Sequence, residues 1–182
     1  MFGSDLPRSA SDRLVVYLLG PGFGESVVVV VPDGRVLVAD ACVSGGQNLP
    51  RALLTALGLA SITLLAITHP DLDHIEGVAE LLTTYRPSRV WTFLLSATFR
   101  DAVARRARAL GEPRLAALAD AVEALDDHQA TTGQVAETGY GRSLRLGDVA
   151  VHALAPTYYD RDRALKAWKT LVAGQNRGRD RL

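Results

Sequence analysis

One six-residue segment, residues 69–74, constrains the fold and function of this chain more than any other feature of its sequence. Four side chains in it can ligate a metal ion: His69, Asp71, Asp73 and His74. The apolar run at residues 62–67, before this segment, has the length of a buried strand. After the segment, apolar residues recur at helical spacing over residues 74–85. In open α/β layers, binding sites commonly lie at the carboxyl ends of strands. We therefore expect a functional site in the turn between this strand and this helix.

The spacing of the four residues predicts how they divide between two ions. Residues i and i+2 of an extended segment point the same way, so His69 and Asp71 can bind one cation together. Asp73 and His74 come where the chain bends into the helix, which suits a second cation. Imidazole and carboxylate ligands suit Zn²⁺, Mn²⁺ or Fe²⁺. Two such ions about 3.5–4 Å apart would activate water at neutral pH and hold an oxyanionic substrate.

A simpler interpretation is an ordinary helix N-terminus. Asp71 or Asp73 would then cap the helix, Glu76 would lie in its first turn, and the histidines would be incidental. Capping accounts for one or two carboxylates. It does not account for two of the four histidines of the chain flanking the same turn, so we favour the metal interpretation.

The segment also resembles a known signature. Residues 69–74, followed by Gly77, are similar to the His-x-His-x-Asp-His motif of the metallo-β-lactamase fold, with Asp71 in place of the second histidine. That variant resembles the hydrolase domain of ComEC-type DNA-uptake proteins. The Gly-rich loop at residues 20–26 and the strand at 36–40, which ends in Asp40, resemble further segments of the same group. The resemblance covers residues 13–95 closely and 140–160 loosely.

The resemblance implies an α/β fold, the metallo-β-lactamase-like αββα sandwich, with two zinc ions in the complete fold, or else Mn or Fe. It implies that Asp40 supports a ligand histidine without binding the metal itself, and that Asp73 also orients the nucleophile. It implies hydrolysis of phosphodiester, nucleic-acid-like substrates, with thioesters and lactams still open, and a Gly-rich loop that forms a wall of the site. The alternative is a non-catalytic binding module that keeps the motif as a scaffold.

The remaining pattern predicts one domain over residues 1–182. Expected strands at 13–19, 27–31, 36–40 and 88–95, with a loop at 44–50 and a helix at 50–57 capped by Asn48, give a mixed sheet. A helical insert is expected at 97–127, with its arginines on a solvated face or in a phosphate-facing lid. A polar linker at 130–141, a hairpin at 143–155 and a frayed tail at 175–182 follow.

The C-terminal part is expected to be short for a complete sandwich, whose second half supplies a bridging aspartate and another histidine. The 26 residues after Pro156 contain no histidine. We therefore expect the N-terminal half plus the helical insert, with the second half largely missing, and a fragment without that half would be inactive. An uncovered apolar sheet face would then promote self-association.

Composition and charge indicate which partners and which cellular compartment to expect. The net charge of zero gives no global field that attracts nucleic acid or a membrane. Cys42 is the sole cysteine, which fits a reducing compartment, and its expected role is a small buried filler. Residues 1–11 lack the apolar core of a signal peptide, so we expect a cytoplasmic protein without a membrane partner. His128, in an expected exposed loop, and His152, in a strand, are expected to be structural.

Overall fold

The computed structural model describes Leu6 and residues 12–20, 25–69, 71–92, 113–137 and 140–154, together with Arg163 and Lys166. Its largest element is a six-stranded mixed sheet in the order β1-β2-β3-β6-β7-β8. The strands are β1 (Val15–Leu19), β2 (Ser26–Val30), β3 (Val36–Ala39), β6 (Leu64–Ile67), β7 (Arg89–Thr92) and β8 (Val135–Glu137). The first three form an antiparallel meander, and β6, β7 and β8 continue the sheet in parallel from β3.

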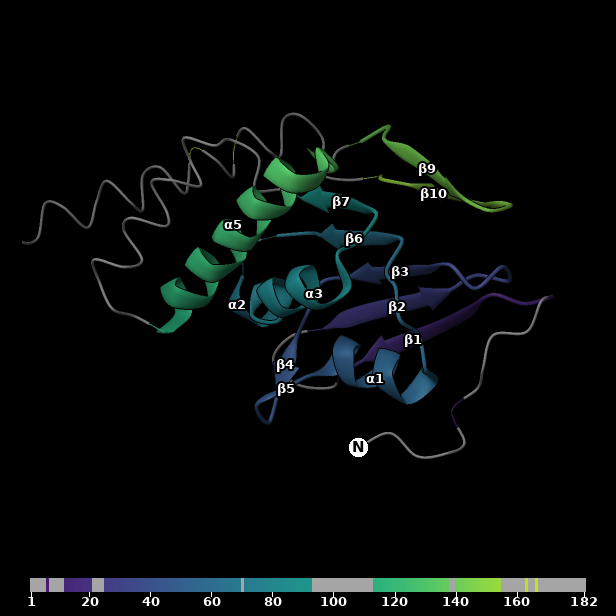
Figure 1. Ribbon diagram of the computed structural model, residues 1–182, viewed down its shortest axis with the longest axis horizontal. Coiled ribbons are helices and arrows are strands. Elements are labelled where there is room, and N and C mark those ends of the chain that lie inside the picture. Colours follow the sequence, from purple (N-terminus) through teal and green to yellow (C-terminus); the bar gives the residue numbers. More distant parts are fainter. Residues whose placement is uncertain are drawn as a thin grey trace, which may run out of the picture.

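A layer of helices covers one face of this sheet (Figure 1). The helices are α1 (Leu49–Leu57), α2 (Leu72–Ile75), α3 (Val78–Tyr85) and α5 (Pro113–Thr132). Their buried apolar side chains form one cluster with alternate residues of the strands, such as Val28, Val38 and Leu65. The predicted cap of α1 is confirmed, because the Asn48 side chain accepts a hydrogen bond from the backbone N–H of Arg51.

The opposite face of the sheet is also apolar but less covered at its β1 edge. On β1, Val16 and Leu18 alternate with the buried Tyr17 and Leu19, so they point away from the helical layer. Val16 is 50% exposed and Leu18 is 78% exposed. No other described strand pairs with the outer edge of β1.

Two small ribbons complete the described structure. One joins β4 (Val43–Ser44) to β5 (Gln47–Asn48), and the other is the expected hairpin of β9 (Ser143–Leu146) and β10 (Val149–His152). The hairpin turns at Gly147, which has a φ of 61°. A Cβ atom there would collide with the Asp33 carboxylate, so this turn lies against the turn between β2 and β3.

Three segments differ from the sequence-based expectation. The expected polar linker contains the end of α5 and the strand β8, which pairs with β7 in parallel. The expected helix at 74–85 is divided into α2 and α3 at Gly77, and the expected loop at 44–50 carries β5. The strand β8 was missed because its three residues form no apolar run and become a strand only through pairing with β7.

Several expectations fall outside the described residues. They concern residues 21–24 of the Gly-rich loop, the end of the strand at 88–95, residues 97–112 of the helical insert and the tail at 175–182. Within the described remainder of the insert, α5 continues to Thr132 instead of ending at 127. None of the helices in the described ranges is long and apolar enough to cross a membrane.

Candidate metal centre

The candidate site lies where two neighbouring parallel strands end. β3 is followed by Asp40 and β6 by Thr68 and His69, so both strands bring polar side chains to the same edge of the sheet. The backbone N–H of Asp40 still donates to the carbonyl of Ala66 at 2.8 Å, as a strand residue would. Asp40 then adopts a φ of 59°, a left-handed conformation that is uncommon for a residue other than glycine. This turn places the Asp40 carboxylate beneath the loop that carries the predicted ligands.

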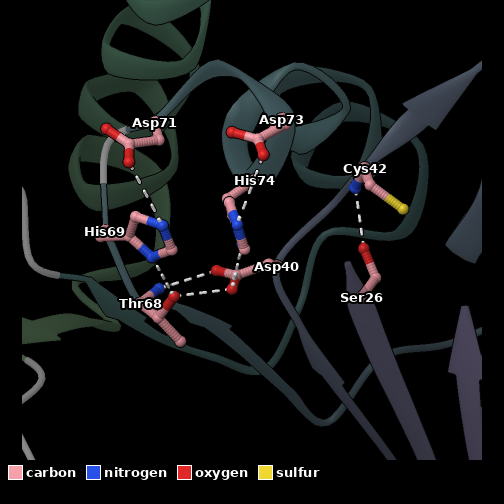
Figure 2. A network of polar contacts seen from close by, with 8 residues as sticks. All are labelled: Ser26, Asp40, Cys42, Thr68, His69, Asp71, Asp73 and His74. Atoms are coloured by element: carbon pink, nitrogen blue, oxygen red, sulfur yellow. Dashed lines mark hydrogen bonds and ion pairs between the residues drawn. The ribbon is translucent and has the colours of Figure 1, made fainter. Parts of the chain in front are cut away.

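Asp40 is a buried carboxylate with three hydrogen bonds. It is 6% exposed. Its Oδ1 accepts the backbone N–H of Thr68 at 2.8 Å, and its Oδ2 lies 2.6 Å from Thr68 Oγ1 and 2.9 Å from His74 Nδ1 (Figure 2). A buried charge needs such partners to offset the loss of water. Asp40 therefore holds both the end of β6 and the ring of His74 in place.

The two histidine rings of the motif lie between the Asp40 carboxylate and the two aspartates of the motif. Figure 2 shows Asp40 and Thr68 on one side of the two imidazole rings, with Asp71 and Asp73 on the other. His69 Nε2 is 3.6 Å from Asp71 Oδ2, and His74 Nε2 is 3.8 Å from Asp73 Oδ2. The centroids of the two rings are 3.9 Å apart. The structure thus brings all four predicted ligands together, in the pairs His69 with Asp71 and Asp73 with His74.

Helix capping does not account for Asp71. This residue occupies the N-cap position of α2, yet its side chain makes no capping hydrogen bond. Its carboxylate is directed toward His69 instead (Figure 2). The capping interpretation is therefore wrong for the Asp71 side chain, whose carboxylate lies beside the His69 ring.

Backbone contacts fix the loop relative to the end of β3. The N–H of Ala41 donates to the carbonyl of His74, and the N–H of Gly77 donates to the carbonyl of Ala41, both at 2.8 Å. The N–H of Cys42 donates to Ser26 Oγ at 2.7 Å. The Cys42 side chain belongs to the main core cluster and is 1% exposed, which agrees with its expected role as a buried filler.

The donor set fits a divalent cation. Asp40, His69 and His74 each offer a ligand atom within 4.8 Å of the others. Both oxygens of Asp40 are already engaged by Thr68 and His74, so Asp40 is better suited to hold a ligand than to be one. Among the described residues, Asp71 and Asp73 lie within ion-pair distance only of histidine rings, so no lysine or arginine neutralises the two carboxylates. The individual ligand roles of His69, Asp71, Asp73 and His74 stay predictions.

Thr68 was not singled out from the sequence. Its hydroxyl lies between Asp40 Oδ2 and His69 Nδ1, at 2.6 and 2.7 Å. A hydroxyl residue directly before a candidate ligand histidine, at the end of a strand, was the available signal. Its partner Asp40 is 28 residues upstream, and only the pairing of β3 with β6 reveals the contact.

The other two histidines lie elsewhere. His128 was expected in an exposed loop, but it is 5% exposed because α5 continues through it and packs on α3. Its Nε2 is buried without a partner among the described atoms, and burial lowers the pKa of the ring. His152 is exposed at the end of β10. Neither belongs to the described group of candidate ligands.

A mixed sheet with helices, carrying clustered His and Asp side chains at its edge, defines an α/β protein with a candidate metal centre. The family model of the metallo-beta-lactamase superfamily matches residues 19–157, so the chain belongs to this superfamily. The match includes residues 96–139, which the resemblance in sequence did not cover. The expected α/β metallo-β-lactamase fold is thereby confirmed, whereas a ComEC-like specificity stays a prediction.

Among solved structures, the chain is similar to a HARLDQ-motif mutant of the metallo-beta-lactamase from Cronobacter sakazakii (Enterobacter sakazakii). The identity is 25% and the TM-score 0.47, and the match covers 75% of this chain and 49% of that one. The chain therefore spans about half the length of that structure. No curated protein matches the chain.

Proposed function

We propose that this chain is a divalent-metal-dependent hydrolase that acts on phosphodiester bonds of nucleic-acid-like substrates. One observation carries the proposal. The loop after β6 gathers two imidazoles and two carboxylates, without a lysine or arginine partner among the described residues, in front of a buried carboxylate that orients one of the rings. Membership of the metallo-beta-lactamase superfamily supports a metal-dependent hydrolase as the general class.

The proposed ligands divide into two pairs. His69 with Asp71 would hold one ion, and Asp73 with His74 would hold the other, with zinc, manganese or iron as the suitable metals. When bound, such ions supply Lewis acidity toward a phosphoryl oxygen and lower the pKa of water. We expect zinc to be the metal in the complete site.

The residues of the chain have distinct proposed tasks. Asp40 fixes the His74 ring through Nδ1, which leaves Nε2 free to bind a metal ion. The side chain of Asp73 is 38% exposed, so its carboxylate can accept a proton from an attacking water as well as contribute a ligand. The side chain of Asp71 is 69% exposed, the most exposed of the four proposed ligands.

The substrate class is inferred from the signature and from exposure. Asp71 in place of a histidine resembles the hydrolase domain of ComEC-type proteins, whose substrates are nucleic acids. The half-exposed His69 side chain, at 41%, and the exposed Asp71 side chain, at 69%, put the site at the surface, where a long polymer can reach it. We therefore favour a phosphodiester over a small buried substrate.

A non-catalytic metal-binding module is the second candidate. All four proposed ligands come from one six-residue segment, and the remaining histidines in the described ranges, His128 and His152, lie outside it. Such a module would bind metal without turnover.

Hydrolysis of bis(p-nitrophenyl) phosphate by the metal-loaded chain separates the two candidates. Any metal-dependent turnover should fall by about 100-fold or more in Asp73→Asn, which corresponds to roughly 3 kcal/mol of barrier. Asp120→Asn, at an exposed position on α5, is the matched control and should leave turnover unchanged. Bound metal without turnover would favour the binding module. Turnover that is equal in wild type and Asp73→Asn would refute the assigned role of Asp73.

A further inference from the structure

We propose that Thr68 is a positioning residue that fixes the tautomer and orientation of the His69 ring. Its hydroxyl donates to Asp40 and accepts from His69 Nδ1, and we call this chain of two hydrogen bonds the relay. The inference deepens the proposed function and rests on its metal-binding part. It concerns a side chain that is no candidate ligand itself, because its hydroxyl is engaged on both sides by Asp40 and His69.

The direction of each hydrogen bond follows from counting protons. A carboxylate has no proton to donate, so Asp40 can only accept. At Oδ2 it therefore accepts from the Thr68 hydroxyl, at 2.6 Å, and from His74 Nδ1–H, at 2.9 Å. The hydroxyl has one proton, and that proton is used toward Asp40. Thr68 Oγ1 can then only accept from the His69 ring nitrogen 2.7 Å away, which places a proton on His69 Nδ1.

Both rings thereby acquire the same tautomer. A neutral imidazole with a proton on Nδ1 has its free lone pair on Nε2. The Nε2 atoms of His69 and His74 are the atoms that face the carboxylates of Asp71 and Asp73, on the side away from Asp40 (Figure 2). One buried carboxylate thus sets both rings for a metal, His74 directly and His69 through a hydroxyl.

His69 needs this relay more than His74 does. The His74 side chain is 18% exposed and contacts Asp40 directly. The His69 side chain is 41% exposed, and Thr68 is its only hydrogen-bond partner at Nδ1 among the described residues. Without the hydroxyl, the ring can rotate and exchange tautomers. The backbone N–H of Thr68 would still bond to Asp40 Oδ1 in any variant, so the loop keeps its other tie.

Imidazole nitrogen NMR of the metal-free chain tests the inference directly. The spectra are recorded well above pH 6.5, where an ordinary imidazole is neutral. We expect the Nδ1–H tautomer for both His69 and His74 in the wild type. In Thr68→Val, His69 should lose this tautomer while His74 keeps it, and Thr68→Ser should restore it. The Nε2–H tautomer for His69 in the wild type, or an unchanged His69 in Thr68→Val, would overturn the relay.

Zinc affinity measured by chelator competition gives a second readout. Loss of a group that orients a ligand histidine typically weakens metal binding by 10–100-fold, so we expect about tenfold for Thr68→Val and near wild-type affinity for Thr68→Ser. Thr83→Val is the matched control, since that exposed hydroxyl bonds only to the backbone of α3. Equal affinity in wild type and Thr68→Val would contradict the positioning role.

The two proposals fail in different ways. Nδ1–H tautomers in a protein that binds no metal would refute the proposed function and leave the relay intact. Tight metal binding with His69 as the Nε2–H tautomer would refute the relay and leave the proposed function intact.

Discussion

Asn48 and Gly77 are fitted against each other where α1 begins and where α2 meets α3. The side-chain Nδ2 of Asn48 donates to the carbonyl of Gly77 at 2.9 Å, while its Oδ1 caps α1. A Cβ atom on Gly77 would lie 2.5 Å from Nδ2 and 2.8 Å from the carbonyl oxygen of Ala41. The glycine after the ligand motif is therefore required by close packing, and its φ of −90° is open to any residue. The contact holds the end of α2, which carries Asp73 and His74, against the start of α1.

Gly77→Ala should destabilise the protein through this contact. The added methyl group has backbone on one side and a buried amide on the other, so we expect a loss of about 1–3 kcal/mol in the free energy of unfolding. Urea denaturation measures the loss. Because Asn48→Ala removes one of the two obstacles, Gly77→Ala should cost less in that background than alone. Strictly additive costs would show that the two residues do not compete for the same space.

His128 should make stability depend on pH. Burial lowers the pKa of His128 below 6.5, and the nearby Arg86 lowers it further, against a hydrogen bond to the Pro87 backbone that raises it. The unfolded chain therefore takes up this proton at higher pH than the folded chain. The stability associated with neutral His128 is fully present above pH 6.5 and is lost as the pH falls from there through the folded-state pKa.

The His128→Gln variant tests this dependence. Below pH 6.5, the free energy of unfolding should fall less steeply in the variant than in the wild type. His152→Gln, at an exposed position, should keep the wild-type slope. Parallel curves for wild type and His128→Gln would contradict the prediction.

The exposed residues of β1 should support self-association, with a second copy of the chain as the partner. β1 is an edge strand among the described strands, and its Leu18 is 78% exposed. Leu18→Lys should therefore reduce both the oligomeric fraction in light scattering and the binding of a hydrophobic dye. Leu154→Lys is the control, since Leu154 is equally exposed, at 75%, but lies beyond β10. An effect of the same size in both variants would argue against a specific role for β1.

Local patterns predicted much of this fold because their causes lie within a few residues. The β-branched run of β2 and the Asn-Leu-Pro start of α1 determine their elements without distant partners. The four-residue ligand cluster was visible for the same reason, since the spacing is a property of one short segment.

The features that were missed depend on distant residues. β8 becomes a strand only beside β7, and α2 ends where Gly77 meets Asn48, 29 residues upstream. The burial of His128 results from α3, and the role of Thr68 from Asp40. Polarity and spacing carry no information about such contacts, because each of them exists only after the sheet has assembled.

Calorimetric titration of the metal-free chain with Zn²⁺ tests the central claim most directly, namely that the loop after β6 binds metal. We predict saturable binding in the wild type, strong weakening in Asp73→Asn, and unchanged binding in His152→Gln, whose ring lies outside the cluster. The Asn variant keeps the shape of the side chain and removes the charge, so loss of affinity would report on ligation. A wild-type chain that takes up no zinc or manganese, or an Asp73→Asn variant that binds as tightly as wild type, would contradict the account.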